Sequence, residues 1–266
     1  MSSRVREWGE ELLHFGLANI KASYFGIFLL LLLLLTHFVE VPLLSRYDFI
    51  FLSAVVYQVV ALVSGHEKLR EFAVIFVFHI VATGMELFKT NPAIGSWAYP
   101  EVGAAVFAVA TVPLFTGFLY SAVGSYISSA FKYLNLRYEN FPAYHHIWII
   151  SVLIYINFFT HHFVYDIRYL LFLYIGVVFA KTVIRFKTYK KEWHLPFILS
   201  GFLMALFVWI AENVGSYSRV WLYPTQVDGW HLVSLHKLES WFLLLILSFA
   251  LVSIVYRHRI ATVSTT

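Results

Sequence analysis

Long apolar stretches follow one another along the whole chain, and the first contains a core, Ile27–Leu35, in which every residue is apolar. A helix that crosses a bilayer needs about 20 mostly apolar residues. Eight stretches approach or exceed this length, at residues 22–40, 48–64, 71–89, 102–131, 146–160, 167–185, 195–213 and 236–256. The pattern predicts an all-α fold, a polytopic membrane bundle of about eight transmembrane helices. Pro113 predicts a kink in the fourth of them.

The composition agrees with a membrane protein and excludes several other classes. Hydrophobic residues make up 60% of the chain and charged residues only 13%, whereas about a quarter of an ordinary soluble domain is charged. The basic residues are scattered in short loops and form no patch, so nucleic acid is not expected as a partner. The chain has no cysteine, which excludes disulfides and thiolate metal sites. The expected partners are membrane lipids and a small apolar or lipid-like substrate.

The distribution of positive charge predicts the orientation of the chain. If the eight stretches are spans, 14 of the 19 Lys and Arg residues lie on one side of the membrane. The other side holds only Arg46, Lys89, Arg168, Arg219 and Lys237. Because the side with more Lys and Arg faces the cytoplasm, both termini are expected to be cytoplasmic.

The chain resembles itself when it is shifted by about 124 residues, which indicates an internal duplication. The matches keep one order: Thr36-His37-Phe38-Val39 with Thr160-His161-His162-Phe163-Val164, Glu40 with Asp166, Arg46-Tyr47 with Arg168-Tyr169, Glu86 with Glu212, and Gly95-Ser96-Trp97-Ala98-Tyr99-Pro100 with Gly215-Ser216 followed by Trp221-Leu222-Tyr223-Pro224. Four spans in each half make the halves parallel, with a pseudo-twofold axis along the membrane normal. The matched residues all lie at non-cytoplasmic helix ends, where they could converge.

The duplication also predicts how the chain is divided. The two parallel four-helix repeats are residues 22–131 and 146–256. A cytoplasmic N-terminal segment, residues 1–21, precedes them, and a cytoplasmic connection, residues 132–145, joins them. Residues 257–266 form a cytoplasmic tail. The connections are too short for an independent soluble domain.

Ionisable side chains inside apolar spans are energetically costly and by default indicate a functional site. Imidazole and carboxylate groups together suit zinc, iron or manganese. The first hypothesis is therefore a divalent metal site, and its candidate ligands are His37, His161, His162, Glu86 and Glu212. The alternative is structural: histidines near the interface turn towards the headgroups, and the glutamates pair with Lys or Arg.

A second hypothesis uses the carboxylates without a metal. Glu86, Glu212 and Asp166 are the candidate catalytic residues, with a protonated glutamate acting as general acid on a lipid alkene or ester. The expected walls of the substrate pocket are Trp97, Tyr99, Trp221, Tyr223, Asn157 and Asn213. Individually, such Trp and Tyr residues are also typical of the aromatic belts that anchor helices at the interface.

Four of these segments together resemble a known family. Glu86–Thr90, Gly95–Glu101, Asn157–His162 and Ala211–Gly215 are similar to the bacterial integral-membrane family called domain of unknown function 817. The resemblance extends from about the second span to the end of the chain. It implies a multi-pass protein of the bacterial inner membrane and brings no assigned activity. A narrower similarity, limited to Glu86–Tyr99 and its repeat, is to membrane-bound carotenoid cyclases and hydratases.

Three functions fit these observations. The first is a membrane-embedded enzyme that acts on a lipid or isoprenoid through the His and Glu residues of the outer side. The second is a transporter or channel with a substrate or proton site on the pseudo-twofold axis. The third is a non-catalytic partner in a membrane assembly. The sequence alone favours the enzyme.

Overall fold

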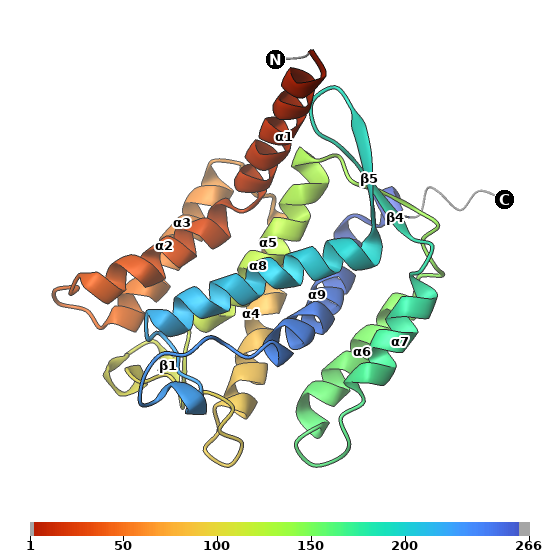
Figure 1. Cartoon of the computed structure of the whole chain (residues 1–266). Helices are drawn as coiled ribbons and strands as arrows, with labels where there is room; N and C mark the ends of the chain where they lie inside the picture. The colour runs from red at the N-terminus through yellow and green to blue at the C-terminus, as the bar shows by residue number, and fades with distance from the viewer. Residues whose placement is uncertain (1–2, 261–266) are drawn as a thin grey trace. The chain divides into compact units, whose positions relative to one another are not determined.

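The computed structural model describes residues 3–260 and is mostly helical (Figure 1). The last six residues of the expected cytoplasmic tail, 261–266, lie outside the described residues, as do residues 1–2. The chain divides into two compact units. Unit 1 comprises Met1–Tyr24, Ser125–Met204 and Phe242–Thr266, and unit 2 comprises Phe25–Gly124 and Ala205–Trp241.

The helices agree closely with most of the apolar stretches. In chain order they are α1 (Ser3–Ala22), α2 (Tyr24–Phe38), α3 (Arg46–Val63), α4 (Leu69–Lys89), α5 (Thr116–Tyr133), α6 (His145–Thr160), α7 (Arg168–Val178), α8 (Phe197–Tyr217), α9 (His236–Val255) and α10 (Arg257–Ile260). Two short 3-10 helices, η1 (Val102–Ala104) and η2 (Pro224–Gln226), lie in the loops that follow α4 and α8.

Within the described residues, four helices are long and apolar enough to cross a membrane: α3, α4, α8 and α9. α1 and α2, which are bent by 71° at the break between them, could together form a fifth span. α6 and α7 are apolar but shorter. At about 1.5 Å per residue, the 11 residues of α7 cover only about half of a hydrocarbon core roughly 30 Å thick. Helix length and composition thus support a membrane protein, and in the described residues four to five of the expected spans meet both criteria.

Two predicted spans are not continuous helices. Residues 102–131 begin with η1 and a small hairpin of β1 (Ala108–Val109) and β2 (Val112–Pro113), and α5 starts only at Thr116. The kink expected at Pro113 is therefore wrong, because this residue ends a strand, where its missing N–H is tolerated.

The predicted span at 167–185 is also interrupted, because its last residues form a strand. β4 (Val183–Lys187) lies between β3 (Arg137–Glu139) and β5 (Glu192–Pro196) in an antiparallel sheet. Apolar and basic residues alternate along β4 after Ile184, a pattern of period two that favours a strand over a helix.

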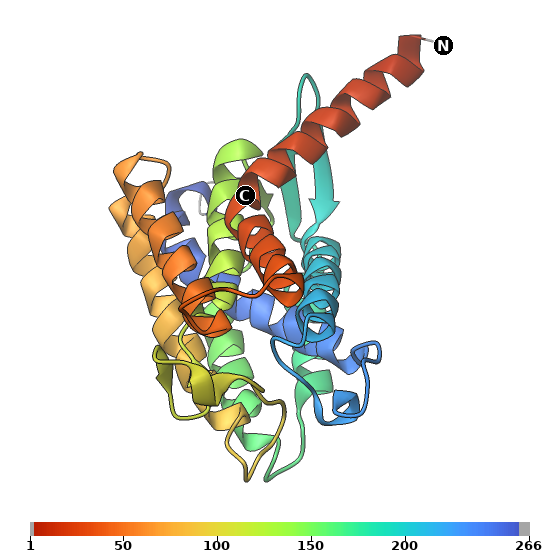
Figure 2. The ribbon, with the colours of Figure 1, turned by 90° about the vertical axis from the view of Figure 1, so that its left-hand side faces the viewer.

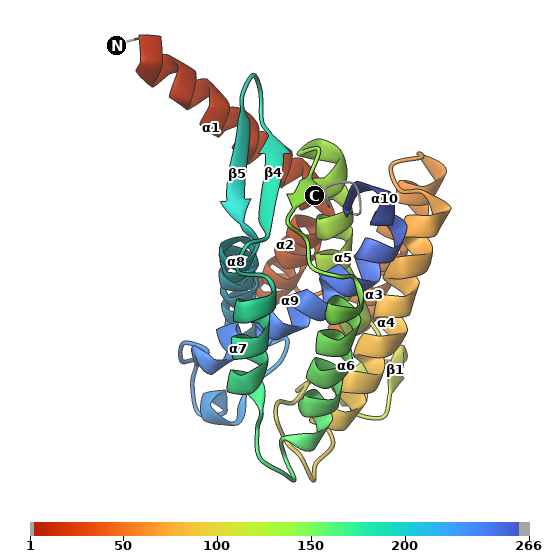
Figure 3. The same ribbon diagram turned by 90° about the vertical axis from the view of Figure 1, so that its right-hand side faces the viewer.

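In unit 1, the hairpin of β4 and β5 lies beside α1 (Figure 3). Glu11, buried in the middle of α1, accepts hydrogen bonds from the turn of this hairpin. The donors are the backbone N–H groups of Lys190 and Lys191, at 2.9 and 3.1 Å, and the hydroxyl of Thr188. One carboxylate thus ties the N-terminal helix to the sheet.

This contact predicts an acid-sensitive attachment of α1. The hydrogen bond from Thr188, with those from the hairpin backbone, lowers the pKa of Glu11 to about 2 despite its burial. A lowered pKa in the folded protein stabilises it above the pKa of the unfolded chain, about 4.5. This stabilisation should be lost as the pH falls from about 4.5 towards about 2. We expect Glu11→Gln to lower the unfolding temperature at pH 7 and to match the wild type near pH 2. Thermal unfolding in detergent measures this difference, and Glu10→Gln, whose carboxylate makes an exposed ion pair with Arg6 on the same helix, is the control at pH 7.

Unit 2 contains α3 and α4, which lie side by side (Figure 2), and the loops that follow α4 and α8. Its main core joins helices and loops, and the fully or nearly buried members are Leu33, Tyr47, Ile50, Tyr99, Phe115, Val220 and Trp221. Tyr47 also donates a hydrogen bond of 2.6 Å to the carbonyl of Val220. The core therefore fixes both Trp-x-Tyr-Pro loops against α2 and α3.

Candidate functional site

The two Trp-x-Tyr-Pro loops of unit 2 pair with each other. Ala98 and Leu222, the central residues of the two motifs, form an antiparallel bridge with two hydrogen bonds of 2.9 Å. In an extended backbone, successive side chains point to opposite sides. The bridge therefore holds the Trp and Tyr residues of both motifs close to one another.

Glu86 lies near the end of α4 and is only 2% exposed. Its Oε2 accepts hydrogen bonds of 2.8 Å from the indole N–H of Trp97 and from the hydroxyl of Tyr99. Its Oε1 accepts a third, of 2.7 Å, from the hydroxyl of Tyr120. All three donors are aromatic side chains, so the carboxylate is held by dipoles inside an apolar environment.

Glu212, near the end of α8, has a corresponding set of partners. Its Oε2 accepts from the hydroxyl of Tyr223, and its Oε1 accepts a hydrogen bond of 3.1 Å from the indole N–H of Trp241. Glu212 is half-buried, whereas Glu86 is fully buried. The two sites are therefore similar in chemistry but unequal in solvent access.

Together these residues form one cluster, here called the glutamate cage: Glu86, Glu212, Trp97, Tyr99, Tyr120, Tyr223 and Trp241. The rings of Tyr120 and Trp241 are in contact, with centroids 5.4 Å apart, and those of Trp97 and Tyr223 are 6.3 Å apart. Tyr120 donates to Glu86 and Trp241 donates to Glu212, so the first of these ring contacts connects the partners of the two carboxylates. The cage therefore brings two carboxylates into a common aromatic enclosure.

The tyrosines of the loops remain hydrogen-bond donors at neutral pH. Burial, and then the charge of Glu86, raises the pKa of Tyr99 well above its usual range. Burial and the charge of Glu212 do the same to the pKa of Tyr223. Both hydroxyl groups therefore keep their protons and present them to the glutamates.

A lysine lies against the cage. The Nζ of Lys237, the second residue of α9, is 4.4 Å from the ring centroid of Trp97 and 4.5 Å from that of Tyr223. Each of these rings also donates a hydrogen bond to one of the two glutamates. The ammonium group thus occupies the corner between the two rings.

Among the expected pocket residues, Trp221 has a different role from its counterpart Trp97. Its ring packs on α8, where Gly215 leaves the space that a Cβ would fill. Asn213, also on α8, accepts from the backbone N–H of Val233 at 2.9 Å and so ties down the loop before α9. Both residues thus support the helix and loops that carry the cage.

The remaining candidates in unit 1 hold the turn between α6 and α7. Asn157 donates to Asp166 at 3.0 Å, and Arg168 forms an ion pair of 2.6 Å with the same carboxylate. Burial alone would raise the pKa of Asp166, but the hydrogen bonds from Asn157 and Arg168 outweigh it and lower the pKa. His161 bonds through Nδ1 to the carbonyl of Asn157 at 2.8 Å. Asp166 is thus held as a charged structural partner.

The expected metal ligands do not assemble within the part of the chain that the structure describes. No group of three or more His, Asp or Glu side chains there could hold a metal ion. Glu86 and Glu212 belong to unit 2, whereas His161 and His162 belong to unit 1. His37, in unit 2, contacts the carbonyl of Ser218 through Nδ1 at 3.1 Å.

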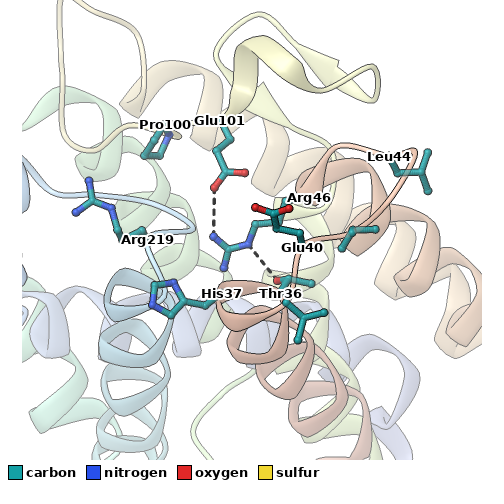
Figure 4. Close-up of a pocket in the computed structure, with 10 residues that line it drawn as sticks. Thr36, His37, Glu40, Leu44, Arg46, Pro100, Glu101 and Arg219 are labelled. Carbon is teal, nitrogen blue, oxygen red and sulfur yellow. Dashed lines mark hydrogen bonds and ion pairs between the residues drawn. The ribbon is translucent and has the colours of Figure 1, made fainter.

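His37 also lines a pocket of about 530 Å³ in unit 2 (Figure 4). Arg46 crosses this pocket, donating to Glu101 at 3.3 Å and to Thr36 at 3.1 Å. Glu40 and Arg219 also face it, and the full lining is Thr36, His37, Val39, Glu40, Val41, Leu44, Arg46, Pro100, Glu101 and Arg219. His37 and Glu40 thus lie at a mixed-charge pocket and are not part of the cage.

Three members of the arrangement were not among the sequence candidates: Tyr120, Trp241 and Lys237. Tyr120 and Trp241 lie in the first two turns of α5 and α9, the helices that follow the two paired loops. The duplication contains the signal that could have found them, because a shift of about 121 residues superimposes one aromatic donor on the other.

Comparison with known proteins agrees with the resemblance noted in the sequence. The model of the family described as "Protein of unknown function (DUF817)" matches residues 11–249, which include the whole cage. The chain is also 36% identical over 245 residues to "Uncharacterized protein YoaT" of Bacillus subtilis (strain 168), an alignment that covers 92% of this chain and 91% of the relative. No solved structure matches the chain.

Proposed function

We propose that this chain, which belongs to the family of unknown function DUF817, is a membrane transporter that exchanges protons for a cation at the Glu86 and Glu212 pair. The observation that carries this proposal is the glutamate cage, in which two carboxylates share one aromatic enclosure. Two like charges in a poorly solvated site repel each other, so a proton or cation bound between them is stabilised. Exchange of one for the other is the simplest chemistry that such a pair performs.

The surrounding architecture fits the transporter hypothesis. α4 and α8 have 21 residues each, and each is followed by a Trp-x-Tyr-Pro loop, a 3-10 helix and another long helix. Glutamates related by an internal repeat, at the interface of two halves, are typical of carriers. We accordingly propose eight membrane segments in two parallel repeats, with both termini in the cytoplasm of the bacterial inner membrane.

A membrane-embedded enzyme that acts on a lipid or isoprenoid is the alternative that the sequence favoured. A general acid must come within hydrogen-bond distance of its substrate. In the cage, both oxygens of Glu86 already accept hydrogen bonds, three in all, from side chains of the protein. Because three side chains surround this carboxylate, a small ion can approach it more easily than a bulky apolar substrate.

The proposal predicts proton movement that depends on the two glutamates. The protein is reconstituted in vesicles that contain a pH-sensitive dye, and gradients of sodium, potassium or methylammonium are applied in turn. At least one gradient should move protons through the wild type. The double variant Glu86→Gln and Glu212→Gln should reduce the rate at least about tenfold, because the amide cannot exchange a proton in this range.

Glu101→Gln is the matched control, since this residue lies in the outer pocket and pairs with Arg46. It should retain most of the wild-type rate. Equal rates in the double variant and the wild type would contradict the proposal. Loss of a lipid or isoprenoid product in cells carrying the double variant, without any proton movement by the wild type, would favour the enzyme instead.

A further inference from the structure

The lysine beside the cage indicates what kind of cation the site takes. We infer that the glutamate cage is a binding site for an alkylammonium ion and that Lys237 occupies it as an internal ligand. This inference rests on the proposed function, because it names the chemical class of the cation that exchanges with protons.

The position of Lys237 is that of a bound ammonium ion. Its Nζ lies within 4.5 Å of the centroids of both Trp97 and Tyr223. Cations within about 6 Å of an aromatic centroid are attracted by the ring, most strongly when they are desolvated. The polar atoms of the same two rings are bound to Glu86 and Glu212, respectively. The site therefore combines ring faces with a nearby negative charge, the two features that aromatic cages use for ammonium ligands.

An inorganic cation fits these surroundings less well. Hard ions such as Mg²⁺ and Ca²⁺ need about six or more oxygen ligands. Three side chains donate to the oxygens of Glu86, which leaves about one of its four lone-pair sites for such an ion. An ammonium group needs no such ligand shell, because the ring faces and the field of the carboxylates replace part of its hydration. The site thus favours weakly hydrated alkylammonium ions over strongly hydrated inorganic cations.

The lysine can leave the cage without unfolding it. Lys237 has a flexible side chain, is only half-buried and lies at the start of α9. Trp241 follows four residues later on the same face of the helix and donates to Glu212. An external ammonium ion would take the place of Nζ, and the lysine would move outwards. Its return would expel the ion, so that the lysine acts as a tethered competitor.

The inference is tested by binding of tetramethylammonium and methylammonium to the purified full-length protein, measured by calorimetry and by tryptophan fluorescence. An internal competitor lowers the apparent affinity in proportion to its occupancy, and occupancy of about nine-tenths lowers it about tenfold. Lys237→Met should therefore bind the probes about tenfold more tightly than the wild type. Lys237→Gln provides a second neutral variant, and both are checked by circular dichroism and size-exclusion chromatography.

Two controls make the result specific. Lys237→Arg keeps the positive charge and should bind as weakly as the wild type. Lys21→Met, which removes an exposed lysine of unit 1, should have no effect. Adding Trp97→Leu to Lys237→Met should abolish the gain in probe affinity, since it removes one of the two aromatic rings that contact the cation.

The inference would be overturned if both neutral variants bound the probes with the same affinity as the wild type. That result is independent of the proton measurement. Tighter ammonium binding without any proton movement in vesicles would refute transport and support the binding site. Proton movement that depends on the glutamates, without tighter binding in either neutral variant, would refute the ammonium site alone.

Discussion

Replacement of Gly215 by alanine is expected to lower the free energy of unfolding by about 2 kcal/mol or more, within the range of overpacked cores. A Cβ at this position would lie 2.0 Å from Cη2 and 2.3 Å from Cζ2 of Trp221. The ring cannot easily move, because the next residue, Leu222, is bridged to Ala98 by two hydrogen bonds. Any shift of the ring would therefore displace the paired loops that carry Tyr99 and Tyr223.

The measurement is thermal unfolding in detergent, together with the proton-movement assay. Gly84→Ala is the matched control, because this glycine lies in α4 and a Cβ there would meet no atom within 4 Å. Alanine favours a helix over glycine by about 1 kcal/mol, so the control should be neutral or slightly stabilised. Gly215→Ala with wild-type unfolding temperature would show that the ring of Trp221 is free to relocate.

The helices were largely predictable from the sequence, and the exceptions have physical causes. Hydropathy identifies α3, α4, α8 and α9 because each has at least 18 residues and is apolar over most of its length. The same measure cannot separate a helix from an apolar strand, so it merged the β1–β2 hairpin with α5 and β4 with α7. β4 is fixed by pairing with β5, which follows it across a short turn, and with β3, which is distant in the sequence.

The duplication predicted the centre of the site but not its asymmetry. It identified Glu86, Glu212, Tyr99 and Tyr223, which all belong to the cage. It also equated the Gly-Ser pairs, yet Gly95 lies in a turn with φ +57° whereas Gly215 lies within α8. The two tryptophans accordingly contact the preceding helix in different ways: the ring of Trp221 packs against Gly215 of α8, whereas Trp97 donates a hydrogen bond to Glu86 of α4.

Glu86→Ala is expected to be the most damaging substitution in the cage. It leaves Trp97, Tyr99 and Tyr120 without their shared acceptor. Each buried donor that loses its partner costs about 1–3 kcal/mol, although removal of a buried carboxylate also recovers its desolvation cost. We therefore expect the free energy of unfolding to fall by at least about 3 kcal/mol, near the lower limit of the summed penalties.

The partner glutamate provides the internal comparison for this prediction. Glu212 has two donors, Tyr223 and Trp241, and is half-buried, so water can replace its carboxylate. Glu212→Ala should thus lower the free energy of unfolding by only about 1–2 kcal/mol. Thermal and denaturant unfolding of both variants in the same detergent measures the difference. If Glu212→Ala were as destabilising as Glu86→Ala, the unequal burial of the two carboxylates would not determine how much each contributes to the free energy of unfolding. If the predicted order holds, Glu86 is the structural anchor of the cage.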